Sequence, residues 1–476
     1  MRAAAPRRVG LLLALMGCAW LLGAALALAE TGAAKPPAAP ALPPFLLGGI
    51  QTAECDVDAW MAALKQNGMN AVQVTIYAEQ AGWDDARLTF DEAPHVVEEI
   101  RAARRAGIAV VLVLRIQFPY VAPAEAAQDP NRFLWHGMIF PRTDAATRAW
   151  FRRYDAFVAH WARIAEAEGV AMLGIASELN ALAATLPIEE TPVLPAYYLS
   201  DDDQQRLRAL VQRLEPRVDD ETRASMGAAD FASLVDFVTA RNAVERAWAR
   251  VYTFADADDP LAAMNRRRAL LDREWRMLIE RTRAIYRGPL TFAANHDAYA
   301  DMGFWDALDW MGINAYFPLR AGLDAPLRVD ALTDAWRTVF DAVAAFRADR
   351  DLTLPILFTE LGYTLRRGTT VAPWSDAGFV PVWAEDGDPA NDDAFFWTAQ
   401  PKHAHERALA VRALHRLWAT GETPLRGLLY WKLSTLPEMR KYEAFMLDLD
   451  PAIDDPLRGE LQRFVNVAPA GKEDAP

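Results

Sequence analysis

Cysteine is nearly absent from this sequence. The 476 residues include two cysteines, Cys18 and Cys55, and seven histidines. Two cysteines cannot build the disulfide framework of a small secreted domain or a cluster of thiolate metal ligands. The sequence also lacks a glycine-rich phosphate loop and the Gly-x-Ser-x-Gly turn of many serine hydrolases. These absences exclude the most common nucleotide-binding and serine-nucleophile motifs.

An excess of positive charge is lacking as well. The chain has 64 acidic and 50 basic side chains, which gives a formal net charge of -14. A general nucleic-acid-binding protein needs a basic surface, so we do not expect this chain to be one. Hydrophobic residues make up 52% of the sequence and charged residues 24%. This composition allows a large buried core, and the length allows either two or three domains or one α/β barrel.

The first 29 residues have the parts of a signal peptide. Basic residues near the start are followed by the apolar run from Val9 to Leu26, and Ala27 and Ala29 then form a small-x-small cleavage signal. Residues 1–29 are therefore predicted to be a signal peptide. We expect export to the periplasm or the exterior of the cell.

Two other fates of this segment stay open. Leu15-Met16-Gly17-Cys18 resembles a lipoprotein signal, and the apolar run is almost long enough to cross a membrane. Lipidation or a retained N-terminal anchor would then tie the protein to the membrane. Residues 30–44 are rich in alanine and proline and are predicted to be a semi-rigid linker. Residues 467–476 are predicted to be a flexible tail, which leaves residues 45–466 for a single catalytic domain.

From Phe45 onward, a short apolar run followed by an amphipathic stretch repeats along the chain. The runs expected as strands are Phe45–Ile50, Ala71–Tyr77, Ala109–Leu114, Val170–Ala176, Leu290–Ala294, Trp310–Ile313, Ile356–Thr359 and Leu428–Trp431. The main helices are expected at Asp58–Gln66, His95–Ala106, Asp144–Glu168, Leu270–Tyr286, Thr333–Arg347, Lys402–Trp418 and Asp455–Phe464. Eight strands alternating with helices predict the α/β class and, within it, a (β/α)8 TIM barrel.

One segment interrupts the alternation. About residues 181–265 lie between the fourth and fifth strands, which is far more chain than a strand-to-helix loop needs. Helices are expected within it at Leu207–Leu214, Phe231–Thr239 and Val244–Tyr252. We interpret it as a helical insertion after strand four that could wall or cap a cleft at the mouth of the barrel.

Polar and aromatic side chains gather where the strands end. The carboxyl ends of barrel strands meet on one face and build the active site. The residues expected on that face include Gln73, Arg115, Ser177, Glu178, Asn295, His296, Asn314, Tyr316, Glu360, Trp431 and Lys432. Amides and carboxylates hydrogen-bond sugar hydroxyls, and flat rings stack on sugar faces. The set is therefore typical of a carbohydrate site.

Two glutamates stand out within this set. Glu178 directly follows the fourth strand and Glu360 the seventh, and these strands lie across the mouth from each other. Cleavage of a glycosidic bond needs one carboxylic acid to protonate the leaving oxygen and a second carboxylate to attack or to activate water. Either glutamate alone is explained equally well as a helix cap or an ion-pair partner. Together, within the polar ring, they favour catalysis.

Several stretches resemble glycoside hydrolase family 113, a family of β-mannanases. The resemblance rests on the stretches Leu290–Asp297, Phe304–Leu319, Leu357–Tyr363 with Pro373-Trp374, Trp150–Trp161 leading to Glu178, and Tyr430–Lys432. It covers about residues 45–464 apart from the insertion. Several features depart from the expected pattern. Ser177 stands where related barrels carry Asn, and His296 stands where Trp is expected. Arg115 and the stretch after it are also unusual, and the insertion has no recognised counterpart.

The resemblance implies a retaining reaction. Glu178 would then be the acid/base, Glu360 the nucleophile and Tyr316 a hydrogen-bond donor to the nucleophile. Asn295, Trp374, Trp431 and Trp135 would line sugar subsites, and His296, Asn314, Lys432 and Gln73 are further candidates for substrate binding. The resemblance implies no metal and no organic cofactor.

The function expected from these observations is hydrolysis of a β-linked polysaccharide, with endo-acting cleavage of β-1,4-mannan or glucomannan as the first choice. Two alternatives stay open: a non-catalytic carbohydrate-binding barrel of the cell envelope, and a hydrolase of the cell's own exopolysaccharide. His403 and His405 open a helix two positions apart and face different sides, so we do not expect a metal site there. We expect a monomer.

Overall fold

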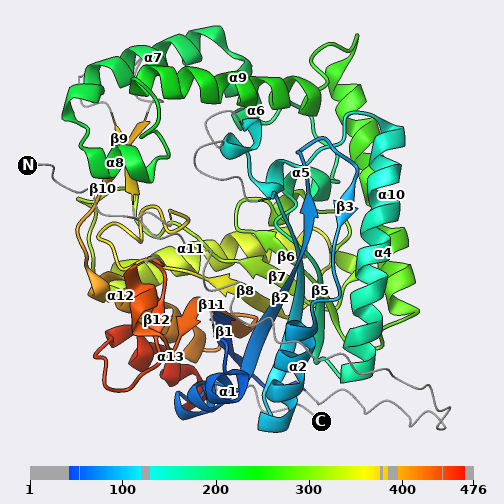
Figure 1. Ribbon diagram of the computed structural model, residues 1–476, viewed down its shortest axis with the longest axis vertical. Helices are drawn as coiled ribbons and strands as arrows, with labels where there is room; N and C mark the ends of the chain where they lie inside the picture. The colour runs from blue at the N-terminus through cyan, green and yellow to red at the C-terminus, as the bar shows by residue number, and fades with distance from the viewer. Residues whose placement is uncertain are drawn as a thin grey trace, which may run out of the picture.

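The computed structural model describes residues 42–52, 54–119, 129–375, 379–383, 395–441 and 443–466. The predicted signal peptide, most of the predicted linker, Cys18 and the predicted tail lie outside these residues. Within them, the central element is a closed barrel of parallel strands surrounded by helices (Figure 1).

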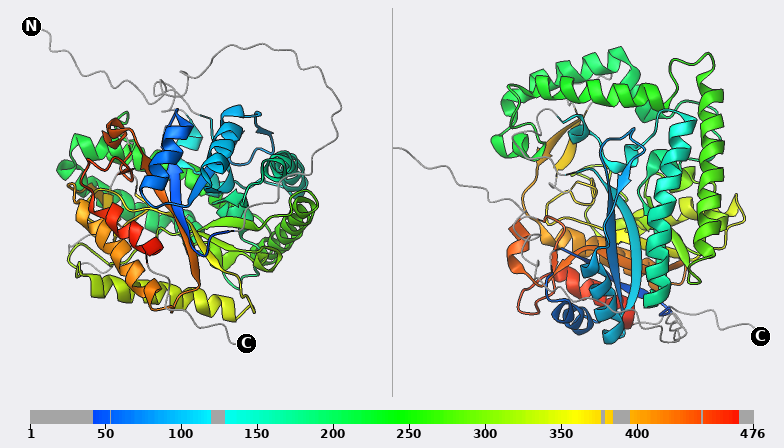
Figure 2. Two further views of the ribbon diagram at one scale, coloured as in Figure 1. Left: turned by 90° about the horizontal axis from the view of Figure 1, so that it is seen from below. Right: turned by 45° about the vertical axis from the view of Figure 1, so that its right-hand side comes forward.

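The barrel strands are β1 (Leu46–Gln51), β2 (Ala71–Gln80), β4 (Ala109–Gln117), β5 (Met172–Ser177), β6 (Leu290–Asn295), β7 (Met311–Asn314), β8 (Ile356–Leu361) and β11 (Leu425–Ser434). Neighbouring strands pair in the order β1-β11-β8-β7-β6-β5-β4-β2, and β2 pairs with β1 to close the ring. The predicted TIM barrel is confirmed. Figure 2 shows the helices arranged around the ring.

The apolar runs form strands because both faces of the barrel wall are covered. Eight of the nine residues of β4 are buried, as expected for a strand that packs against the barrel interior on one face and helices on the other. Each fully buried Val, Leu or Ile side chain contributes roughly 1.5–3 kcal/mol. A continuous apolar run therefore buries more side chains, and gains more free energy of burial, than an alternating pattern of the same length.

Helix α4 (Asp144–Glu168) shows how sequence sets the outer layer. The Thr143 side chain accepts a hydrogen bond from the backbone N–H of Ala146 and starts the helix, and Gly169 in the left-handed region ends it. Trp150 and Trp161 lie on the face that is fully buried against the barrel. The predicted bounds of this helix are confirmed.

The other large helices around the barrel are α1 (Val57–Gln66), α2 (Pro94–Ala106), α10 (Pro260–Arg283), α11 (Val329–Ala348), α12 (Ala404–Ala419) and α13 (Pro456–Asn466). Short strands β3 (Leu88–Thr89) and β12 (Leu447–Asp448) pair with β2 and β11. The hairpin of β9 (Phe379–Trp383) and β10 (Phe395–Ala399) follows β8 and was not predicted from the sequence. No helix among the described residues is long and apolar enough to span a membrane.

Between β5 and β6 the chain forms α5 (Asn180–Ala183), α6 (Val193–Leu199), α7 (Asp201–Leu214), α8 (Asp220–Ser225) and α9 (Leu234–Tyr252) before α10. Two helices predicted at Phe231–Thr239 and Val244–Tyr252 are one helix, α9; no glycine or proline interrupts it. The α6–α9 segment lies above the carboxyl ends of the barrel strands in Figure 1.

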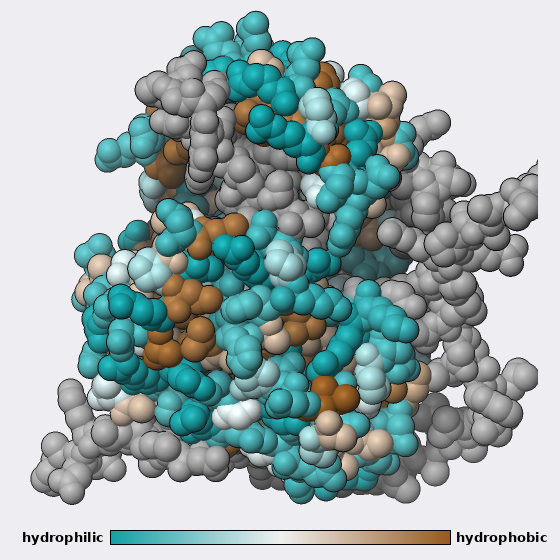
Figure 3. Space-filling model, turned by 90° about the vertical axis from the view of Figure 1, so that its left-hand side faces the viewer, coloured by the Kyte–Doolittle hydropathy of each residue, from teal (hydrophilic) through white to brown (hydrophobic). Residues whose placement is uncertain are grey.

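Loops on opposite sides of the barrel hold this segment. The Arg132 guanidinium, after β4, donates to Asp230 at 2.8 and 3.0 Å and to the Gly227 carbonyl at 2.7 Å. On the other side, Arg366 lies 3.4 Å from Glu221, and α8 packs against β10. On the face drawn in Figure 3, hydrophilic residues cover most of the described surface, and hydrophobic residues appear only in small patches.

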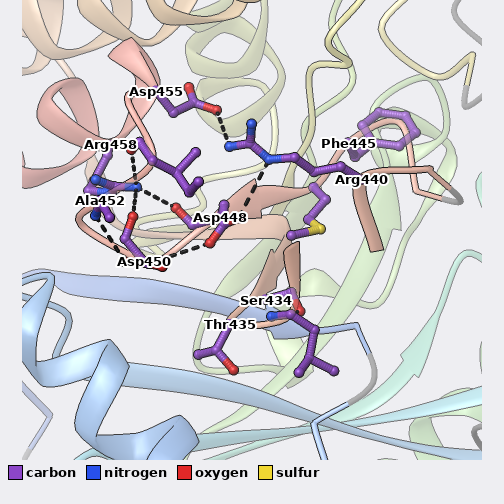
Figure 4. Close-up of polar contacts among 12 residues, drawn as sticks. Ser434, Thr435, Arg440, Phe445, Asp448, Asp450, Ala452, Asp455 and Arg458 are labelled. Atoms are coloured by element: carbon purple, nitrogen blue, oxygen red, sulfur yellow. Dashed lines mark hydrogen bonds and ion pairs between the residues drawn. The ribbon is translucent and has the colours of Figure 1, made fainter. Parts of the chain in front are cut away.

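A buried group of charges anchors the chain that follows β11 (Figure 4). Arg440 lies 3.6 Å from both Asp448 and Asp455, and the Arg458 guanidinium donates to the carbonyl of Asp448. Arg407 of α12 pairs with Asp455 and donates to the carbonyl of Phe445 at 3.1 Å. Because buried charges are costly unless paired, this network specifies one path for the loop beside the barrel mouth.

Candidate active site

Glu360 lies at the end of β8, almost completely removed from solvent. The Tyr316 hydroxyl donates a hydrogen bond of 2.5 Å to its Oε2 atom, and the Arg115 guanidinium forms an ion pair with Oε1. Tyr316 stays a neutral donor, because burial above all, and then the charge of Glu178, raise its pKa well above the usual value. The carboxylate of Glu360 is thus fixed in direction and compensated in charge.

Glu178 directly follows β5 and has a left-handed backbone, with φ 52°. Such a conformation costs a non-glycine residue of order 1–3 kcal/mol and is concentrated at functional sites. The Asn314 amide donates to Oε1 of Glu178 at 2.8 Å, and His136 Nε2 lies 3.3 Å from Oε2. Both oxygens of this carboxylate are therefore held by neighbouring side chains.

Side chains from β7 and from the chain just after it contact both glutamates. Thr359 Oγ1 donates to the side-chain oxygen Oδ1 of Asn314 at 2.8 Å, which directs the side-chain Nδ2 of Asn314 toward Glu178. Tyr316, two residues further along, contacts Glu360. Asn314 and Tyr316 are separated by one residue, so one short segment of chain positions both carboxylates. A two-carboxylate glycosidase needs two such groups held at one site.

The charge of Glu178 is unusual for a proton donor. Burial raises the pKa of its carboxyl. His136, through its hydrogen bond and charge, opposes that effect, as do the charge of Arg115 and the amide of Asn314, and the resulting pKa is about 2. An ionised carboxylate suits a general base, whereas the first step of glycosidic cleavage needs a proton on the leaving oxygen.

Two exposed tryptophans lie near these carboxylates. Trp374 is 45% exposed and stacks on the His296 ring, with centroids 5.7 Å apart and planes at 11°. Trp135 is 37% exposed and meets the ring of His136 edge-on at 5.2 Å. Its ring lies so close to Gly137 that a Cβ atom there would stand 2.3 Å from it. Flat, accessible rings of this kind can stack on sugar faces.

Strand β11 brings a third tryptophan to the mouth. The Arg115 guanidinium lies 4.9 Å from the centre of the Trp431 ring, and Lys432 Nζ lies 4.4 Å from it. The peptide bond between Trp431 and Lys432 is cis. Lys432 Nζ also lies 2.7 Å from Glu443 Oε2, so its charge is already paired. Lys432 is therefore suited to hydrogen bonding rather than to nucleophilic chemistry.

His296 and Asn295 follow β6. Asn295 Oδ1 accepts from the backbone N–H of His296 at 2.8 Å and lies 2.9 Å from its ring Nδ1. Burial lowers the pKa of His296, and the charges of Asp297 and Glu178 oppose this only in part. A neutral His296 stacked on Trp374 extends the flat surface beside Glu178.

Gln73 differs from the other predicted residues. It is completely buried, and both of its amide atoms lack a hydrogen-bond partner among the described residues. On β2 it lies four residues before Tyr77, the register partner of Arg115. At about 3.3 Å per residue it sits roughly 13 Å deeper in the barrel than Arg115. Contact between Gln73 and a sugar remains a prediction.

Sequence reasoning assigned no role to Arg115 or His136. Arg115 is the first charged residue after the apolar run of β4, and a charged residue in a buried strand indicates a partner of opposite charge. His136 lies in a short helical turn after β4, at His136–Met138, with no strand pattern around it. Only the folded chain brings its ring to Glu178.

Further residues hold the active side chains in place. Gly362 has no side chain, and a Cβ atom there would lie 2.5 Å from the Tyr316 ring. Phe445 packs edge-on against the same ring at 6.0 Å. Glu406, completely buried in α12, accepts hydrogen bonds from Arg320 at 2.7 Å and from the backbone of Thr370 at 3.0 Å. It thereby fixes the loop that carries Trp374.

The chain matches the sequence model of one enzyme family. The sequence model of Glycoside Hydrolase Family 113 matches residues 50–185 and 231–399, more than half of the chain, including Glu178 and Glu360. The unmatched residues 186–230 hold α6, α7 and α8. No curated protein sequence matches the chain.

Solved structures show the same fold. A family 113 β-mannanase from Alicyclobacillus acidocaldarius, in complex with ManMIm, is 16% identical and has a TM-score of 0.53, with 89% of this chain and 97% of that chain covered. A family 113 β-1,4-mannanase is 14% identical, also with a TM-score of 0.53, over 89% of this chain and 99% of that chain. At such identities the likeness establishes the barrel fold alone.

Proposed function

Because the chain belongs to glycoside hydrolase family 113, and is therefore a glycoside hydrolase, we propose that it cleaves β-1,4-mannan or glucomannan internally and with retention of configuration. The observation that carries the proposal is the arrangement around β7, where Asn314 holds Glu178 and Tyr316 holds Glu360. The β-mannanases among similar structures support mannan as the substrate.

Glu360 is the proposed nucleophile. Its carboxylate attacks the anomeric carbon and forms a glycosyl-enzyme ester. As the carboxylate loses its negative charge, its interactions with Arg115 and Tyr316 weaken. When water later cleaves the ester, the same two groups stabilise the carboxylate that leaves. Because both donors are buried and fixed in advance, they act without reorganising.

Glu178 is the proposed acid/base. It protonates the leaving oxygen in the first step and takes a proton from the attacking water in the second. The left-handed backbone and the Asn314 amide fix the direction of its carboxylate. Trp374, Trp135 and Trp431, with Asn295 and Lys432, are proposed to bind successive sugar units.

The proposal is tested on mannan, glucomannan, xylan and a panel of bacterial exopolysaccharides. We expect product from mannan or glucomannan, and a loss of about 10³-fold or more in Glu178→Gln and Glu360→Gln. Glu190→Gln, which changes an exposed carboxylate between β5 and β6, is the matched control. Wild-type activity in Glu360→Gln would overturn the assignment of roles, and cleavage of an exopolysaccharide alone would favour the alternative substrate.

Export is part of the proposal. It is supported by the basic start, the apolar run and the Ala27-Leu28-Ala29 signal in the sequence. A secreted or periplasmic hydrolase would meet mannan directly, and a membrane link would come only from a lipid at Cys18 or a retained anchor. Fractionation of cells that express the full chain, with mass determination of the mature N-terminus, distinguishes these fates. The chain is proposed to act as a monomer.

A further inference from the structure

Several charged or titratable groups surround the Glu178 carboxylate. His136 approaches from the turn after β4, Arg115 from the end of β4, His296 and Asp297 from the chain after β6, and Tyr316 from the chain after β7. Arg115 pairs with Glu360, and the ring Nδ1 of His296 is engaged by Asn295. Asp297, which is exposed, accepts from the Asn180 amide at 3.3 Å.

His136 differs from these groups in its relation to the carboxylate. Its Nε2 atom lies 3.3 Å from Glu178 Oε2, is buried, and has no other hydrogen-bond partner among the described residues. The Trp135 ring packs edge-on against the imidazole and restricts it. A nitrogen in this position can exchange a proton with one acceptor, and that acceptor is Glu178.

We propose that His136 stores the proton that Glu178 delivers to the leaving oxygen, so that the two side chains form a proton relay; this inference rests on the proposed role of Glu178 as acid/base. In the first step the imidazolium of His136 passes its Nε2–H proton to the Glu178 carboxylate, and Glu178 passes one proton on to the glycosidic oxygen and is again a carboxylate. The glycosidic bond breaks, the leaving sugar departs as an alcohol, and His136 becomes neutral.

The second step restores the starting state. Water attacks the anomeric carbon of the ester on Glu360, and its hydroxyl remains on the sugar. Its proton passes to the Glu178 carboxylate and from there to His136 Nε2. One proton leaves the pair in the first step and one returns in the second, so the cycle needs no other donor. His136 acts through Glu178 and is therefore a positioning residue.

The charges at the site support storage of the proton on His136 and its delivery by Glu178. With its pKa lowered to about 2, Glu178 cannot retain a proton near neutral pH. An imidazolium–carboxylate pair carries the same total charge as an imidazole beside a carboxylic acid. Transfer within the pair therefore leaves the net charge of the site unchanged.

The test compares His136→Gln with the wild-type protein. The glutamine amide can still donate a hydrogen bond to Glu178 but cannot supply a proton. On mannan oligosaccharides, we expect a fall in kcat/KM of about 10- to 100-fold near pH 7, since a positioned general acid contributes about 10²–10⁴-fold. The alkaline limb of the pH profile should move to lower pH by about one unit or more, because Glu178 must then carry the proton itself.

A second substrate separates chemistry from structural damage. A dinitrophenyl β-mannoside oligomer has a leaving group that departs without protonation. We expect His136→Gln to cleave it at a rate within about twofold of wild type, because only the acid step is impaired. His95→Gln, at an exposed histidine of α2, is the matched control and should leave both substrates unaffected.

The outcomes are distinguishable. An unchanged alkaline limb in His136→Gln, or equal losses on both substrates, would overturn the relay. Full activity of Glu178→Gln on mannan oligosaccharides would instead refute the proposed function on which the relay rests. If Glu178→Gln is inactive on the oligosaccharide while His136→Gln keeps the wild-type profile, the relay alone fails.

Discussion

The Tyr316 hydroxyl donates a buried hydrogen bond of 2.5 Å to Oε2 of Glu360. Gly362 approaches one edge of the ring, and Phe445 packs against it. Phe445 is in turn held through its carbonyl by Arg407. The position of one hydroxyl thus depends on three elements distant in sequence.

Replacing Tyr316 by Phe removes the donor and keeps the ring. The fold should be retained, because the ring still fills its buried position. We expect kcat to fall by about 10²-fold, as for loss of a fixed donor at a site where charge changes in the transition state. Steady-state kinetics on a mannan oligosaccharide measures the effect. A loss of less than about threefold would contradict a role in stabilising Glu360.

Replacing Gly362 by Ala tests the position of Tyr316 rather than its chemistry. The new methyl group would stand 2.5 Å from the ring, so the ring or the backbone must move. Because small displacements of catalytic groups cost up to about 10²-fold, we expect kcat to fall by about tenfold or more. Gly459→Ala on α13, where a Cβ meets nothing within 4 Å, is the control and should have wild-type kinetics. Equal kinetics for the two variants would show that the close approach is unimportant.

The eight barrel strands were predictable from the sequence, because each buried parallel strand is a continuous apolar run that can be recognised by itself. The α6–α9 segment was predicted less well. Its helices α6 and α8 are seven and six residues long, too short to show a helical period. The hairpin of β9 and β10 was missed because its strands pair with each other across residues 384–394 rather than with the barrel. Pairings of that kind leave little local signal.

Glu99 should make stability depend on pH. Burial raises the pKa of its carboxyl to about 7, although the hydrogen bond from Gln51 opposes this. Between the unfolded value of 4.5 and 7 the folded state holds the extra proton, so the contribution of Glu99 to stability is complete below pH 4.5 and is lost as the pH rises through 7. The full contribution is about 3 kcal/mol.

Glu99→Gln removes this titration. The free energy of unfolding in urea should fall between pH 5 and pH 8 by about 2 kcal/mol less in the variant than in the wild type. Glu98→Gln, at an exposed position on the same helix, should behave as the wild type. The same pH dependence in Glu99→Gln and wild type would mean that Glu99 is ionised in the folded protein.

Glu406 should be important for stability. Its removal in Glu406→Ala leaves the buried guanidinium of Arg320 unpaired and frees the backbone around Thr370. We expect a loss of about 3–5 kcal/mol in the free energy of unfolding, as for other broken buried pairs. Thermal and urea unfolding measure it. Glu422→Ala, at an exposed ion pair, should change stability by less than about 1 kcal/mol.

Trp374 should contribute to binding rather than to the chemical step. Trp374→Ala removes an exposed ring stacked on His296 and leaves both carboxylates in place. We expect KM for long mannan oligosaccharides to rise by about tenfold, since stacking on an aromatic ring contributes roughly 1 kcal/mol or more. Leu194→Ala, at an exposed position of α6, is the control. A fall in kcat with unchanged KM would place Trp374 in the chemistry.

The candidate site was predictable only as far as the strand ends reached. Glu178, Glu360, Asn314 and Tyr316 lie at or just after the ends of barrel strands, and their proximity follows from the common direction of those strands. His136 lies on a turn whose path depends on contacts made elsewhere, such as the bond from Trp248 Nε1 to the Met138 carbonyl at 2.7 Å. No local pattern places its ring at Glu178.

The stereochemistry of the first product tests the central claim most directly. Proton NMR during hydrolysis of a mannan oligosaccharide records which anomer forms before mutarotation. Two carboxylates acting as acid/base and nucleophile invert the anomeric carbon twice, so the account predicts that the β-anomer appears first. Initial formation of the α-anomer would show a single displacement by water and would contradict the assignment of Glu360 as nucleophile.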